Sequence, residues 1–221
     1  MTEVDIYSFG MDTSFCRFGD ALPVTKLMSD AKRNYRRSDE RNAIQAKLAR
    51  EFIVEYINNH TFDLMPSNFV VIDCRGFYES KDTLIHSKSR GHTGLHPENA
   101  VRIMQHKHFN QSFLPDFYQQ FEDAMKNSRI MQRRRIGIAV YCNKGRDRSV
   151  GCAELLRKLL LSQKHKCPEF QVRVKHICKS EWRSTDGRSC PPKCKFCDGQ
   201  LDNDMDFARE YDRHNWKSVK W

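Results

Sequence analysis

The sequence lacks a long hydrophobic run. No stretch approaches the ~20 consecutive apolar residues that a membrane-spanning helix needs. The longest apolar runs, such as residues 159–161, are short and lie beside charged residues. The first ten residues include acidic groups and no apolar segment of the kind that a secretory signal contains. We therefore expect a protein without a membrane partner, located in the cytoplasm or the nucleus.

Internal repeats and low-complexity linkers are also absent from the 221 residues. A chain of this length has enough residues for one full hydrophobic core. Hydrophobic residues make up 39% and aromatic residues 11%, which is typical of globular proteins. We expect one domain over residues 1–177, with a helical insertion at about 26–60, followed by a cysteine-rich appendage and tail over residues 178–221.

Acidic residues are scarce in one half of the chain. From Lys126 to Lys195 there are 19 Lys or Arg residues against 5 Asp or Glu residues, a surplus of 14 positive charges. The whole chain carries a formal net charge of +10, so the remaining residues sum to −4. A concentrated positive field attracts polyanions and releases their counterions, which makes RNA a candidate partner.

Hydrophobic patterning predicts an alternation of strands and helices. Strands are expected at residues 4–9, 68–74, 136–141 and 170–177, and helices at residues 38–57, 97–106, 114–127 and 150–161. This order predicts an α/β fold with a mostly parallel or mixed sheet flanked by helices. The strand at residues 68–74 reads NFVVIDC and places Asp73 near its carboxyl end. Ligands bind at that edge of an open α/β sheet.

The 142–149 loop, which reads CNKGRDRS, lies between a predicted strand and a predicted helix. Its backbone N–H groups and the N-terminus of the following helix carry partial positive charge. Three side chains of the loop add full positive charges, and one glycine permits a tight turn. The predicted phosphate-binding residues of the loop are Cys142, Asn143, Lys144, Gly145, Arg146, Asp147, Arg148 and Ser149.

The same loop fits the pattern C-x5-R-[ST] of cysteine-dependent phosphatases. In that alternative Cys142 is the nucleophile, Arg148 binds the phosphate oxygens, and Asp73 or Asp147 is the general acid. The histidine that usually precedes the cysteine is Tyr141 here. We therefore favour a phosphate-binding loop without turnover and keep the phosphatase as the alternative.

Several motifs in order resemble the C-terminal domain of the RapZ family of bacterial RNase adapters. They are SFG at 8–10, VIDCRGF at 71–77, RGHTGL at 90–95, the strand and loop IAVYCNKGRDRSV at 138–150, and VKHI at 174–177. The resemblance implies an α/β fold, a pocket for a phosphorylated small molecule, and RNA as a second partner. It also adds five residues to the implied phosphate site, namely Asp73, Arg75, Thr93, Gly94 and His176.

Some features depart from the bacterial pattern. No Walker motif is present, residues 11–67 form a long insertion, and the cysteine-rich appendage is an addition. The loop has Asn143 and Lys144 where the family has Thr-Gly, and Asp147 where the family has a histidine.

Four of the nine cysteines lie in one short segment, Cys178, Cys190, Cys194 and Cys197. In a chain without a visible secretory signal, such clustering favours a metal site over disulfides. The spacing predicts one structural zinc ion, with Cys178 preferred over His176 as the fourth ligand. Separately, His92 and His96 flank Thr93 and Gly94 in a loop that can reach the phosphate pocket.

Overall fold

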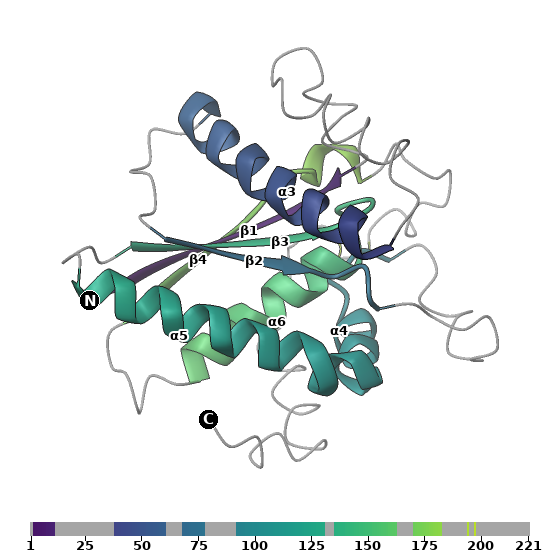
Figure 1. The fold of residues 1–221 in the computed structure, drawn as a ribbon. Coiled ribbons are helices and arrows are strands. Elements are labelled where there is room, and N and C mark those ends of the chain that lie inside the picture. The colour runs from purple at the N-terminus through teal and green to yellow at the C-terminus, as the bar shows by residue number, and fades with distance from the viewer. Residues whose placement is uncertain are drawn as a thin grey trace.

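The computed structural model describes residues 2–11, 38–60, 68–77, 92–130, 135–162 and 170–182, together with Cys194 and Cys197. Four strands form one parallel sheet in the order β2-β3-β1-β4 (Figure 1). They are β1 (Thr2–Gly10), β2 (Asn68–Asp73), β3 (Arg135–Cys142) and β4 (Phe170–His176). The predicted α/β class is confirmed, and the described sheet is parallel throughout.

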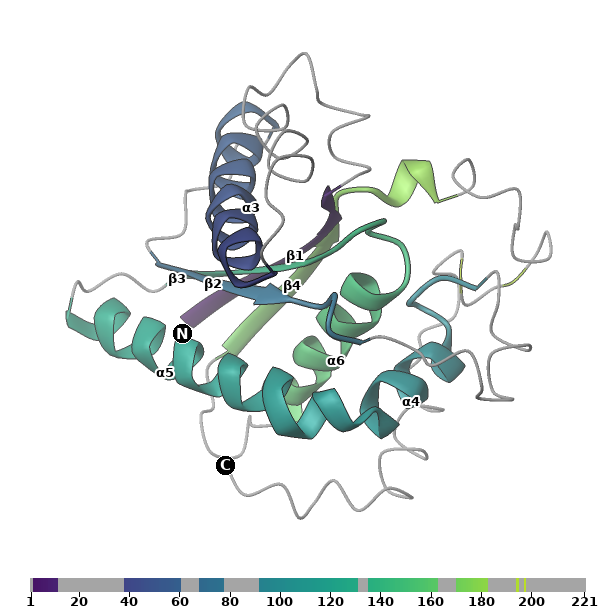
Figure 2. The ribbon, with the colours of Figure 1, turned by 45° about the vertical axis from the view of Figure 1, so that its right-hand side comes forward.

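Helices cover both faces of the sheet, as Figures 1 and 2 show from two sides. Of the described α-helices, only α3 (Ser38–His60) covers one face. The other face carries α4 (Pro97–Gln105), α5 (Leu114–Ile130) and α6 (Arg148–Ser162). These helices confirm the four sequence predictions to within a few residues. A π-helical turn (Phe109–Phe113) that the pattern did not predict leads directly into α5.

Each face of the sheet has its own hydrophobic core, because successive strand residues point to opposite faces. Ile6 and Ile138 pack under α4, α5 and α6, whereas Tyr7 and Tyr141 pack under α3.

Within the described part of the chain, no helix is long and apolar enough to cross a bilayer.

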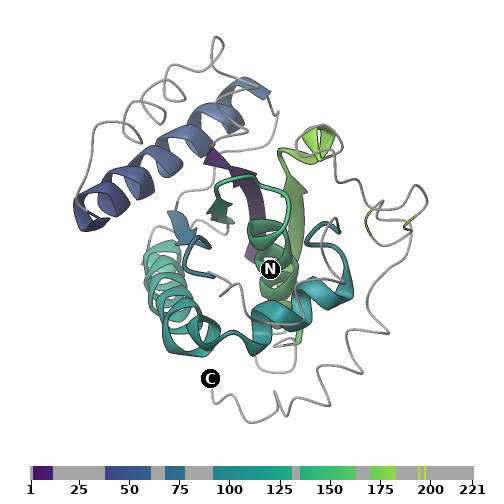
Figure 3. The same cartoon turned by 90° about the vertical axis from the view of Figure 1, so that its right-hand side faces the viewer.

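The parallel arrangement brings the carboxyl ends of all four strands to one edge of the sheet. In the register of the sheet, Gly10 pairs with Cys142, Asp73 pairs with Tyr141, and His176 pairs with Ser8. Viewed in Figure 3, α3 and the other helices lie on opposite sides of the strands. The candidate residues at strand ends therefore share this edge, which is where the sequence predicted a ligand site.

Candidate functional site

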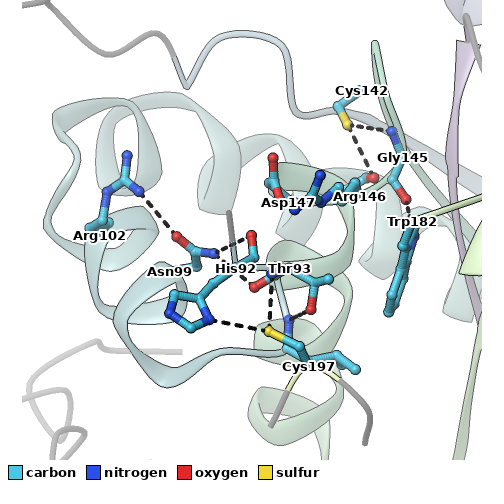
Figure 4. Close-up of polar contacts among 12 residues, drawn as sticks. His92, Thr93, Asn99, Arg102, Cys142, Gly145, Arg146, Asp147, Trp182 and Cys197 are labelled. Carbon is cyan, nitrogen blue, oxygen red and sulfur yellow. Dashed lines mark hydrogen bonds and ion pairs between the residues drawn. The ribbon is translucent and has the colours of Figure 1, made fainter. Parts of the chain in front are cut away.

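The 142–149 loop curls around the sulfur atom of Cys142 (Figure 4). The backbone N–H of Gly145 donates a hydrogen bond to Cys142 Sγ over 3.1 Å, and Ser149 Oγ lies 3.2 Å from the same sulfur. Gly145 has a φ of 66°, a left-handed conformation that favours glycine. The loop thus leaves β3, turns back at Gly145 and enters α6 at Arg148.

Two neighbours hold the loop from the side of β1. A Cβ atom added to Gly10 would lie 2.2 Å from the carbonyl carbon of Lys144, so the two backbones are in direct contact. The indole Nε1 of Trp182 donates a hydrogen bond to the carbonyl oxygen of Gly145 over 3.0 Å. Trp182 follows the 3-10 turn η4 (Lys179–Glu181) and is buried. Neither residue was predicted as part of the site.

The turn at residues 92–96 holds the loop from the opposite side. The backbone N–H of Gly94 donates to the carbonyl oxygen of Arg146 over 2.9 Å. A Cβ on Gly94 would lie 2.2 Å from the carbonyl oxygen of Asp147, so no side chain fits there. The amide of Asn99 in α4 fixes this turn by donating to the carbonyl oxygen of Thr93 over 2.7 Å. Gly94 therefore lies against the loop and Thr93 directly precedes Gly94, while the contact of both residues with phosphate stays a prediction.

The three cationic side chains of the loop have different surroundings. Lys144 is exposed, whereas Arg146 is only 5% exposed and lies 3.7 Å from the carboxylate of Asp147. Arg148 is half-buried, and its Nη1 donates to the carbonyl oxygen of Arg75 over 3.1 Å. Together with the N-terminus of α6, these charges give the loop an environment that suits an anion.

Asp73 and Arg75 form a compact ion pair at the end of β2. Both carboxylate oxygens of Asp73 accept hydrogen bonds from the Arg75 side chain, and Oδ1 also accepts one from the Arg75 backbone N–H. Burial acts to lower the pKa of Arg75, but its bonds to Asp73 outweigh burial and raise it. The guanidinium lies 5.4 Å from the ring centre of Tyr141, whose own pKa is raised by burial and by the charge of Asp73. The carboxylate of Asp73 thus fixes the side chain of Arg75, and the backbone carbonyl oxygen of Arg75 accepts a hydrogen bond from Arg148.

His176 lies at the end of β4 with both ring nitrogens engaged. Its Nδ1 lies 2.7 Å from Ser8 Oγ, and its Nε2 lies 3.2 Å from Glu154 Oε1 in α6. Glu154 also accepts a hydrogen bond from Arg157 over 2.9 Å. Burial acts to raise the pKa of Glu154, but His176 and Arg157 outweigh burial and lower it. His176 therefore joins β4 to α6 beside the loop, and its predicted contact with phosphate stays a prediction.

A cluster of metal-ligating side chains joins the 92–96 turn to the appendage. The ligand atoms of His92, Cys194 and Cys197 all lie within 4.8 Å of one another. His92 Nδ1 lies 3.4 Å from Cys197 Sγ and 3.6 Å from Cys194 Sγ. A tetrahedral zinc ion, with Zn–S near 2.3 Å and Zn–N near 2.0–2.1 Å, separates a nitrogen and a sulfur ligand by roughly 3.5 Å. The three residues therefore fit a metal ion.

The donor set differs from the predicted one. Cys194 and Cys197 are brought together as expected, but the third described donor is His92. Cys178 is buried in the core beneath α3, where its sulfur accepts a hydrogen bond from the backbone N–H of Gly10 over 3.4 Å. Cys190 lies outside the described residues. His92 could have been considered from the sequence, because it directly precedes the Thr93-Gly94 pair assigned to the pocket.

Comparison with known families identifies the domain. The family model described as the RapZ C-terminal domain matches residues 59–178, which is more than half of the chain. The chain belongs to this family. The matched segment contains β2, β3, β4 and the 142–149 loop, while the central strand β1 lies outside it. Membership in the RapZ C-terminal domain family indicates a nucleotide- or phosphate-binding module. Searches of curated proteins and of solved structures found no match.

Proposed function

We propose that this RapZ C-terminal domain binds the phosphate group of a small phosphorylated ligand at the 142–149 loop. The observation that carries the proposal is the position of the loop. It follows the inner strand β3, turns at Gly145 with positive φ, and enters the N-terminus of α6. Helix N-termini and turns of this kind present N–H groups to anions.

Arg148 is the side chain proposed to bind the phosphate oxygens. Its guanidinium is positioned by the carbonyl oxygen of Arg75, which is itself fixed by the ion pair with Asp73. A cation that is already positioned loses less conformational freedom when the ligand arrives. This ordered set joins three of the predicted site residues, of which Arg148 is the one proposed to contact the anion.

The test is the substitution Arg148→Ala, with phosphate binding followed by calorimetry. Hydrogen bonds to a charged group contribute about 1.5–3 kcal/mol, so we expect binding to weaken roughly 10- to 100-fold. The matched control is Arg157→Ala, which removes the same charge from the same helix at a residue that pairs with Glu154. Equal phosphate affinity in Arg148→Ala and Arg157→Ala would remove Arg148 from the site.

RNA is the second partner that we propose, because an RNA backbone presents the same phosphate chemistry. The surplus of 14 positive charges between Lys126 and Lys195 supports it. For such binding, the logarithm of affinity falls linearly with the logarithm of salt concentration. Fluorescence anisotropy of a labelled single-stranded RNA at several salt concentrations tests this. If the protein binds phosphate but shows no salt-dependent binding of RNA, RNA is excluded and the small phosphorylated molecule remains the proposed ligand.

A phosphatase activity is the alternative function, and the surroundings of Cys142 favour it. The Gly145 N–H donates a hydrogen bond to the Cys142 sulfur and the Ser149 hydroxyl lies beside it, as the C-x5-R-[ST] pattern of phosphatases would place them. The candidate general acids give less support. Asp73 accepts bonds from Arg75 on both oxygens, and Asp147 lies beside Arg146. We therefore propose binding rather than hydrolysis.

We also propose that the metal is a structural zinc ion bound by His92, Cys194 and Cys197. Thiolate and imidazole donors suit zinc, and zinc bound to such sites contributes directly to folding. In this proposal the metal attaches Cys194 and Cys197 of the appendage to the turn at residues 92–96. The division of the chain at residue 177 remains a prediction.

A further inference from the structure

The metal cluster and the phosphate loop contact the same short turn. His92 contributes a donor atom to the cluster, and the next residue, Thr93, donates its backbone N–H to Cys197 Sγ over 3.3 Å. The residue after that, Gly94, donates its backbone N–H to Arg146 of the loop. Figure 4 shows this path from Cys197 through His92 and Thr93 toward Arg146 and Asp147.

We propose that a zinc ion bound by His92, Cys194 and Cys197 fixes the turn at residues 92–94 and thereby holds the 142–149 loop in its anion-binding conformation. The part of this inference that concerns anions rests on the function proposed above. The part that concerns the shape of the loop rests on the proposed zinc site and not on anion binding. Zinc occupancy then regulates the affinity of the loop for phosphate without contacting the ligand.

The tight packing of Gly94 explains how the turn acts on the loop. Its Cα position leaves no room for a Cβ, which would lie 2.2 Å from the carbonyl oxygen of Asp147 and 2.3 Å from the backbone nitrogen of Gly151. A turn that fits so closely cannot shift without moving Asp147 or the first turn of α6. Close-packed interiors transmit small displacements in this way.

Hydrogen bonds connect the metal-binding residues to the backbone of the turn at residues 92–94. A sulfur held by zinc is a fixed thiolate acceptor for the Thr93 N–H, and outer-shell bonds of this kind orient metal ligands. Asn99 holds the carbonyl oxygens of both His92 and Thr93, at 3.3 and 2.7 Å. Without zinc, no shared metal ion joins Cys197 to His92. The turn then depends on its hydrogen bonds with Asn99 and Arg146 and on the packing of Gly94 against α6.

Coupling between two sites usually changes affinity by roughly 5- to 150-fold, and the effect is reciprocal. We expect zinc removal to weaken phosphate binding within this range. Saturating phosphate should strengthen zinc binding by the same factor. Reciprocity distinguishes coupling from simple damage to the protein, because phosphate binding to a damaged loop would not change the affinity for zinc.

The experiment compares the full chain in zinc-loaded and chelator-treated forms under reducing conditions. Amide hydrogen exchange over residues 143–148 reports the loop itself, exchange over residues 136–140 in β3 reports global stability, and calorimetry measures inorganic phosphate affinity. We expect chelation to accelerate loop exchange at least about fivefold, to leave β3 protected, and to weaken phosphate binding.

Three variants complete the test. His92→Ala should reproduce the effect of chelation, while His92→Cys, which keeps a zinc donor, should restore zinc content and loop protection. His108→Asn is the control, because His108 packs on Phe77 and is outside the donor group. A merely structural role of His92 would not be rescued by cysteine.

The outcomes separate the two proposals. Loop exchange that is equal with and without zinc would overturn the coupling, as would a His92→Cys variant that behaves like His92→Ala. Loop exchange that depends on zinc in a protein that binds no phosphate would support the coupling and overturn the proposed function instead.

Discussion

Gly10 at the end of β1 lies directly against Gly145 in the phosphate loop. A Cβ on Gly145 would lie 2.3 Å from the Gly10 nitrogen, and one on Gly10 would lie 2.4 Å from the Gly145 nitrogen. The contact is between backbones, which cannot move aside as a flexible side chain can. The end of β1 therefore fixes the position of the 142–149 loop relative to the edge of the sheet.

Gly10→Ala should destabilise the fold and distort the loop. Overpacking a well-packed site costs about 1–3 kcal/mol of unfolding free energy, which urea denaturation measures. Gly76→Ala is the matched control, because the three atoms nearest its Cβ all belong to the side chain of His108 rather than to the backbone. We expect Gly10→Ala to lose more stability than Gly76→Ala and to bind phosphate more weakly. Equal stability and affinity in the two variants would contradict the contact.

Trp182 offers a built-in reporter of the loop. In a background with Trp216→Phe and Trp221→Phe, it is the single tryptophan of the chain. Because its indole donates to the Gly145 carbonyl, we expect its fluorescence to change when phosphate binds the loop. Trp182→Phe should cost about 1 kcal/mol of unfolding free energy, the usual net contribution of one hydrogen bond. A phosphate titration with no fluorescence change, in a protein that binds phosphate by calorimetry, would argue against this position of Trp182.

The strands and helices were predictable because their signals are local. The apolar runs before Asp73 and Cys142 predict buried strands, and the loop between a strand and a helix predicts an anion site. The order of the strands was not predictable. β1 lies between β3 and β4, and that choice depends on packing between segments far apart in sequence.

The candidate metal site shows the same limit. Cys194 and Cys197 form a short motif that can be recognised locally, but His92, which lies beside them, precedes Cys194 by 102 residues. Cys178 shares the sequence cluster, yet β4 ends just before it and carries it beneath α3. Proximity in sequence therefore grouped Cys194 with Cys197, whereas Cys178 lies in the core beneath α3 and outside the described cluster.

Acid should weaken the fold through Glu154. Burial acts to raise the pKa of this carboxyl, but its hydrogen bonds and charge pairing with His176 and Arg157 lower it below the usual value of 4.5. A carboxyl whose pKa is lower in the folded state contributes stability above its unfolded pKa. That stability is lost as the pH falls through the folded value.

Glu154→Gln should therefore be less stable than wild type at neutral pH and lose less stability on acidification below about pH 4.5. Urea denaturation between about pH 6 and pH 3 measures the difference. Glu122→Gln is the control, because Glu122 is an exposed partner of Lys126 on α5. A Glu154→Gln variant with the same acid profile as wild type would show that the pair with His176 does not stabilise the fold.

Cys142→Ser separates a binding domain from an enzyme. Hydrolysis by a cysteine-dependent phosphatase needs a thiolate to attack phosphorus and an acid to protonate the leaving oxygen. The Gly145 N–H contacts the Cys142 sulfur, but both carboxylate oxygens of Asp73 accept hydrogen bonds from Arg75. We expect the wild type to release no phosphate from an aryl phosphate beyond the rate of the Cys142→Ser variant. Both should bind phosphate with similar affinity, since serine keeps a hydrogen-bonding atom beside Gly145 and Ser149.

Cys152→Ser, which alters a buried cysteine of α6 instead, controls for general effects of thiol removal. Turnover by wild type and Cys152→Ser that is lost in Cys142→Ser would assign the domain to the phosphatases.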